Sequence, residues 1–161
     1  MVRAGVGGRG AELALVEGTA RRTPGVSLEE VFLRAVAGLP GPTGKDYRGE
    51  VVAGALGYLQ EGFGAHYATP KAATDDAILV GDYAYARAVE TIAHLDEPRF
   101  VGVASRMIRD GAGEISRGNA VSLELWTPHL AQLLAIISGE NERRSEARIW
   151  AAIEEVEGAG E

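Results

Sequence analysis

The chain has 161 residues and no cysteine, which excludes disulfides, thiolate metal sites and a cysteine nucleophile. Long apolar runs are also missing: the longest, 133–137 and 149–153, are far shorter than the roughly 20 residues that a membrane span requires. The first residues lack the apolar stretch of a signal peptide. The formal charge of −7 argues against nucleic acid as a partner. These absences predict a cytoplasmic protein without a membrane span.

Helical periodicity dominates what is present. Apolar residues recur at steps of three and four along most of the chain, and no run of alternating β-branched residues stands out. We therefore predict an all-α fold of about six to eight helices. Residues 1–22, which begin with a glycine-rich stretch, are expected to form a mobile N-terminal segment, and residues 23–161 a single helical domain.

Capping residues, glycine and proline predict where the helices begin and end. Ser27 and Glu30 have capping-box spacing, Asp75 or Asp76 can cap a later helix, and Pro98 suits a first helical turn. Residues 113–126 are expected to continue helically, and Thr127-Pro128 to kink a helix or begin a new one. The main expected helices cover about 27–39, 46–66, 75–94, a stretch from 98, a segment ending at Gly139, and 142–157, which Gly158 ends.

Asp82 lies on a stripe that otherwise suits burial. Its neighbours at helical spacing are apolar: Ile78, Tyr85, Val89 and Ile92. A buried carboxylate must be hydrogen-bonded, paired or protonated. We therefore predict that Asp82 is a buried structural carboxylate that orders helix packing, and a ligand or metal role is the alternative.

Lys45 and Arg48 form a possible anion site. They are three residues apart at the start of a predicted helix, so they are expected to share one side, near free backbone N–H groups. Such a site can hold a phosphate through the arginine fork and the lysine charge. Two solvated basic residues beside a loop are the alternative. The three histidines, His66, His94 and His129, lack zinc-site spacing and are expected at the surface or at helix ends.

Three segments, in the correct order, resemble the trans-prenyl diphosphate synthases. Leu79–Ala88 reads LVGDYAYARA and is similar to the family's LAGDYLLARA helix. Ala104–Ile115 is similar to the helix that follows it in the family. Gly44–Gly49 reads GKDYRG and looks like the GKxxR motif that grips the diphosphate of isopentenyl diphosphate. The resemblance covers roughly residues 38–120, and it implies a trimmed isoprenoid-synthase-like helical bundle with Lys45 and Arg48 as diphosphate-binding residues.

The two Asp-rich magnesium motifs of that family are not found. The expected place of the first reads HYATPK over 66–71, without a carboxylate. The second has no counterpart beyond the late acidic stretch at Glu154, Glu155 and Glu157. Ionising an allylic diphosphate needs positive charge on the departing group, which metal ions held by carboxylates supply. We therefore expect no catalytic residues, no cofactor for the chain alone, and Mg²⁺ only through a catalytic partner.

The resemblance implies a non-catalytic auxiliary or regulatory subunit of a heteromeric polyprenyl diphosphate synthase. Its expected partner is a catalytic prenyl diphosphate synthase subunit, or a second copy of the chain through self-association. Three alternatives stay open. One is a stand-alone isoprenoid- or diphosphate-binding protein. Another is a divergent prenyltransferase with a metal site at Asp75, Asp76 and Asp82, and the last is a ligand-free helical oligomer.

Overall fold

The computed structural model describes residues 26–67 and 74–161, and the predicted mobile segment 1–22 lies outside these ranges. Within them the chain forms six α-helices, one 3₁₀ turn and no strand, which confirms the all-α prediction. The elements are α2 (Leu28–Ala37), η1 (Gly41–Lys45), α3 (Tyr47–Tyr67), α4 (Asp75–Ala93), α5 (Pro98–Ser116), α6 (Leu123–Ser138) and α7 (Glu142–Ala159).

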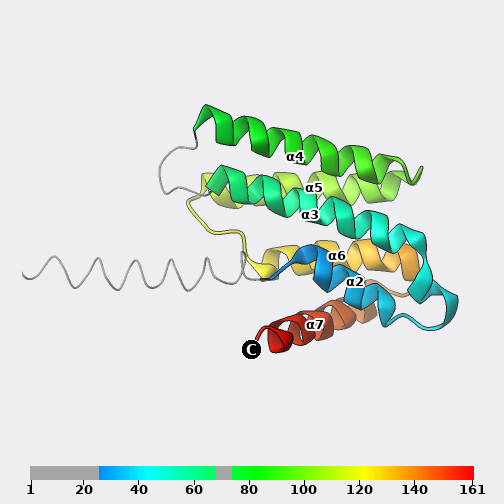
Figure 1. Ribbon diagram of the computed structural model, residues 1–161. Coiled ribbons are helices and arrows are strands. Elements are labelled where there is room, and N and C mark those ends of the chain that lie inside the picture. The colour runs from blue at the N-terminus through cyan, green and yellow to red at the C-terminus, as the bar shows by residue number, and fades with distance from the viewer. Residues whose placement is uncertain (1–25, 68–73) are drawn as a thin grey trace, which may run out of the picture.

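The helices form a closed ring of neighbours. From α3 to α7 each helix packs on the next one along the chain, α7 packs on α2, and α2 packs on α3. Helix α6 also contacts α2 and α3 across the ring. Helix α4 lies on the outside of the bundle and packs on α3 and α5, with α7 at the opposite side (Figure 1). No helix in the described ranges is long and apolar enough to cross a membrane.

The predicted apolar stripes of α2, α3 and α5 form the core. The α3 stripe is fully buried, as predicted from its three- and four-residue steps. Helices α2 and α5 bury their predicted faces in the same way, and α6 adds a nearly continuous apolar surface because it is enclosed by several neighbours. The principal side chains are Leu28, Val31, Val52, Leu56, Leu59, Phe63, Phe100, Met107, Leu130 and Leu134.

Capping explains most helix starts. Ser27 accepts a hydrogen bond from the Glu30 backbone N–H at 3.2 Å, which confirms the predicted cap of α2. Helix α4 differs from the prediction, since Thr74 is its cap and accepts from the Ala77 N–H at 3.2 Å. Asp75 and Asp76 follow in the first turn, where carboxylates interact favourably with the helix dipole.

Two predicted boundaries in the C-terminal half are wrong, and one of the two alternatives at a third is excluded. Residues 117–122 lie between helices rather than continuing α5, because Gly118 has a positive φ of 79° and Ser122 caps a new helix. Pro128 lies inside α6, in its second turn, so it does not begin a helix, and the kink that is the other alternative stays a prediction. Helix α7 continues through Gly158 to Ala159, because a glycine costs only about 1 kcal/mol in a helix and does not end it by itself.

Helix α4 buries a different face from the predicted one. Its buried residues are Gly81, Ala84, Ala88 and Ile92, whereas Ile78 is exposed. A Cβ at Gly81 would lie 3.2 Å from the backbone carbonyl oxygen of Gly62 and 2.0 Å from Cδ2 of His66, so α4 and α3 approach closely where residue 81 has no side chain. The small residues therefore lie on the side that packs on α3, and the large apolar residues in the first half of α4 are exposed, whereas Ile92 near its end is buried.

This rotation overturns the prediction for Asp82. Its side chain is 63% exposed, and its contact is His66, whose Nε2 lies 3.6 Å from Oδ1. The backbone carbonyl of Ile78 also lies 3.4 Å from the same Nε2. Asp82 is therefore a surface carboxylate beside the end of α3, and it is not a buried structural group.

Candidate functional site

The segment that resembles a diphosphate-binding motif forms the junction between η1 and α3. Asp46 separates the two elements, and its Oδ1 accepts a hydrogen bond from the Arg48 backbone N–H at 3.0 Å, as a helix cap does. Gly49 lies against α2, where an added Cβ would be 2.7 Å from Cγ1 of Val36. One glycine of the segment is thus required by close packing in this fold.

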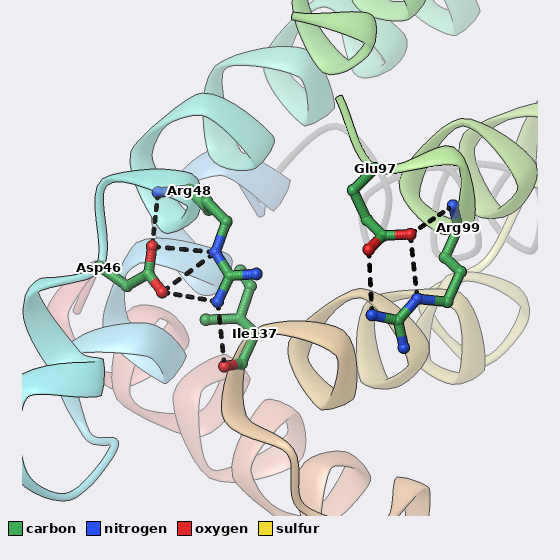
Figure 2. Close-up of polar contacts among 5 residues, drawn as sticks. All are labelled: Asp46, Arg48, Glu97, Arg99 and Ile137. Atoms are coloured by element: carbon green, nitrogen blue, oxygen red, sulfur yellow. Dashed lines mark hydrogen bonds and ion pairs between the residues drawn. The ribbon is translucent and has the colours of Figure 1, made fainter. Parts of the chain in front are cut away.

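Arg48 is held by the carboxylate of Asp46 (Figure 2). Its Nη2 donates to Oδ2 at 2.7 Å, and its Nε lies 3.1 Å from both carboxylate oxygens. The same Nη2 reaches the carbonyl oxygen of Ile137 at 3.5 Å, near the C-terminus of α6. This fork–fork pair is partly buried and joins the start of α3 to the end of α6.

Lys45 lies outside the helix that contains Arg48. It is the last residue of η1 and is exposed, whereas Arg48 lies in the first turn of α3, on the other side of Asp46. The premise that both cations belong to one helix start is therefore wrong, because α3 begins two residues after Lys45, and a shared side for the two side chains stays a prediction. The structure leaves the predicted phosphate binding by Lys45 and Arg48 untested.

A second pair with the same spacing lies at the start of α5. Glu97 accepts from Nε of Arg99 at 3.0 Å and from the Arg99 backbone N–H at 3.2 Å. Both pairs lie at helix starts, one at α3 and one at α5, and Figure 2 shows them in one view. Each holds one carboxylate and one guanidinium, so the four charges of this cluster cancel.

The pKa shifts agree with carboxylates and guanidinium groups that are bound to each other. The hydrogen bond from the Arg48 side chain lowers the pKa of Asp46, and Asp46 in turn raises the pKa of Arg48. The hydrogen bond from Arg99 lowers the pKa of Glu97, to which the charge of Arg48 contributes. Both carboxylates are therefore ionised at neutral pH, and a diphosphate at Arg48 has to compete with Asp46 for the guanidinium.

The alternative metal site at Asp75, Asp76 and Asp82 is not assembled by the fold. Asp75 and Asp76 are exposed in the first turn of α4, and Asp82 follows more than one turn later, beside His66. Across residues 26–67 and 74–161, no group of three or more histidine or acidic side chains is placed to hold a metal ion.

One polar pair was missed by the sequence analysis. His129 is only 8% exposed, which contradicts its expected place at the surface or at a helix end. Its Nε2 lies 3.0 Å from Oδ2 of Asp110, on α5. Because the two residues come from different helices and are 19 positions apart, no local spacing in the sequence predicts the contact. Burial lowers the pKa of His129 against the opposing attraction of Asp110.

Comparison of the chain with protein-family models, with curated proteins and with solved structures gives no match.

Proposed function

We propose that the chain is a non-catalytic auxiliary subunit of a heteromeric polyprenyl diphosphate synthase. The resemblance of Gly44–Gly49, Leu79–Ala88 and Ala104–Ile115 to that family provides the class of partner. The fold is helical throughout the described ranges, as such a subunit requires. The subunit acts by packing on a catalytic synthase chain, and Mg²⁺ enters the complex with that partner.

The observation that carries the proposal is that Asp46 already occupies the guanidinium of Arg48. The resemblance implies that this arginine binds diphosphate, but here its guanidinium is bound by Asp46 and also reaches a backbone carbonyl of α6. An arginine already paired with a carboxylate in fork geometry has few donors left for a phosphate. The motif-like segment thus supports the fold, which suits a chain that keeps the architecture and leaves substrate binding to its partner.

Co-purification tests the proposal. The tagged chain is recovered from its own cell, and associated proteins are identified by mass. The expected result is a synthase chain that carries both Asp-rich motifs. The purified pair is then assayed for prenyl transfer and product length, with each chain alone as control. The pair should be active with Mg²⁺, and the chain alone should be inactive.

A substitution at Arg48 separates this proposal from the diphosphate-binding alternative. Inorganic diphosphate is titrated against the chain and against Lys45→Ala and Arg48→Ala. Saturable binding that either substitution abolishes would support a stand-alone binding protein. Magnesium-dependent turnover by the chain alone would overturn the auxiliary role and favour a divergent enzyme.

A further inference from the structure

The outer face of α4 carries large apolar side chains in solvent. Leu79 and Tyr83 are each 66% exposed and Val80 is 50% exposed, although the helix is packed on α3 and α5 along its other side (Figure 1). Such residues are normally few on a monomer surface, and a contiguous group marks a site of association. Leu79 and Tyr83 lie one turn apart, so they form one stripe on the helix. We call Leu79, Val80 and Tyr83 the α4 patch.

Opposite charges flank the α4 patch at its two ends. Asp76 lies one turn before Val80, and Arg87 lies one turn after Tyr83. The two charged residues are about three helical turns apart, so they lie along the same flank of the helix. Within the described ranges Asp76 forms no ion pair. Arg87 donates to Tyr58 Oη at 3.2 Å and lies 3.6 Å from Glu90, and its side chain is still 42% exposed.

We propose that the α4 patch binds the α4 patch of a second copy of this chain, in antiparallel orientation. A two-fold axis that crosses α4 at the level of Gly81 and Asp82 places Leu79 against Tyr83 of the copy. The same axis brings Asp76 beside Arg87 of the copy, and this ion pair occurs twice in each dimer. A symmetric interface must be self-complementary in this way, and the charge order along α4 meets that condition.

The inference goes beyond the proposed function and does not depend on it. Helix α7 lies at the opposite side of the bundle from α4 (Figure 1). It carries the exposed Trp150, and α2, which packs on α7, carries the exposed Leu33. A catalytic partner therefore has apolar surface available away from the α4 patch.

Analytical ultracentrifugation of the full chain tests the dimer. The expected mass is twice 16.9 kDa at high micromolar concentration, with dissociation on dilution. Leu79→Glu should weaken self-association by at least about tenfold, because it places a charge in the centre of the contact. Leu33→Glu is the matched control on α2 and should leave the dimer unchanged. Far-UV circular dichroism confirms that each variant is folded.

Charge exchange tests the register. Asp76→Arg and Arg87→Asp each replace both ion pairs by like charges, so each variant alone should dimerise roughly tenfold more weakly. When the two variants are mixed, positions 76 and 87 carry opposite charges in both contacts of the mixed dimer, so both ion pairs are restored there. The mixture should therefore recover dimer that neither variant forms alone.

Three results would overturn the inference. The first is a monomeric mass for the unaltered chain at high micromolar concentration. The second is a dimer that Leu79→Glu does not weaken, which would place the interface elsewhere. The third is a mixture of the charge variants that remains monomeric. A monomeric chain that captures a catalytic synthase, and loses it in Leu79→Glu, would assign the α4 patch to that partner and refute self-pairing.

Discussion

His129 and Asp110 form a partly buried polar contact between α6 and α5, in which Nε2 of the histidine donates to Oδ2 of the aspartate at 3.0 Å. The carboxylate can only accept, so the proton is on Nε2. The other ring nitrogen, Nδ1, is buried and has no hydrogen-bond partner within the described ranges. Protonation of the ring would therefore place an unsatisfied N–H in the interior, which favours the neutral imidazole.

This arrangement predicts a pH-dependent stability. Burial holds the pKa of His129 below its ordinary value of about 6.5. The unfolded chain thus binds more protons than the folded chain between the two pKa values, and stability rises with pH across that window. The contribution is complete above pH of about 6.5 and is lost as the pH falls toward the folded pKa. Urea unfolding from pH 7.5 to pH 5, to be compared with His129→Gln, measures it.

The variant is the control for this prediction. Glutamine keeps an N–H donor for Asp110 but does not titrate, so its unfolding free energy should fall less over the same range. Titration of Asp110 does not contribute to the change in stability over this pH range. Burial raises its pKa, but Arg109 and His129 outweigh burial, so the net pKa is lowered and its contribution is lost only in more acidic solution. Equal slopes for both proteins would contradict the prediction.

Gly111 is required by packing between α5 and α6. A Cβ there would lie 2.5 Å from Cζ of Phe63 and 2.9 Å from the Trp126 ring. These rings are themselves in contact, with centroids 5.0 Å apart, so neither can move freely. Gly111→Ala should therefore lower the unfolding free energy by about 1–3 kcal/mol, although alanine is the better helix former.

Gly102 provides the matched control on the same helix. An added Cβ there meets only the far end of the Arg106 side chain, at 3.5 Å. Gly102→Ala should raise the unfolding free energy by up to about 1 kcal/mol, because helix propensity is then the main effect. Urea denaturation of the two variants, side by side, checks both signs. A stabilising Gly111→Ala would show that the two rings can rearrange.

The buried faces of α2, α3 and α5 could be predicted because each has one large apolar stripe. On α3 the three- and four-residue steps of Val52, Leu56 and Leu59 mark a stripe that the bundle buries. Helix α4 could not be predicted in this way. Its buried face combines the small residues Gly81, Ala84 and Ala88 with Ile92, because the small residues let α4 approach α3 closely, and Ile78 of the predicted stripe is exposed. Hydrophobicity alone therefore selects the wrong face.

The candidate site shows a similar limit. Lys45 and Arg48 can be recognised as cations near a helix start, but their partners depend on the first helical residue and on Asp46 between them. The spacing of Asp46 and Arg48, which recurs in Glu97 and Arg99, is the available signal for a closed pair. The contact of His129 with Asp110 depends on how α5 and α6 pack, which no local pattern contains.

Gln60 is predicted to hold the start of α2 against α3. Its Nε2 donates to the Val26 carbonyl at 2.7 Å, and its Oε1 accepts from the Leu28 N–H at 2.9 Å. Gln60→Glu removes the donor and places a carboxylate against a carbonyl oxygen, so the unfolding free energy should fall by about 1–3 kcal/mol. Glu61→Gln, at the exposed neighbouring position, should change stability little, and urea unfolding compares them.

Asp46 is predicted to contribute to stability while it blocks anion binding by Arg48. Asp46→Asn keeps an oxygen for the Arg48 backbone N–H but removes the charge that holds the guanidinium. The unfolding free energy should fall by about 1–3 kcal/mol, and the affinity for inorganic diphosphate should rise because the fork of Arg48 is released. Urea unfolding and calorimetric titration measure the two effects.

The Glu97 pair is the control for Asp46. Glu97→Gln removes the same kind of charge from a pair whose arginine is 65% exposed, so its effect on stability should be smaller than that of Asp46→Asn. It should also leave diphosphate affinity closer to that of the unaltered chain, because Arg48 stays bound to Asp46. An Asp46→Asn variant that is as stable as the parent would show that solvent replaces the carboxylate at no cost. One that is less stable but binds diphosphate no better would show that the carbonyl of Ile137 and the α3 backbone still hold the guanidinium away from anions.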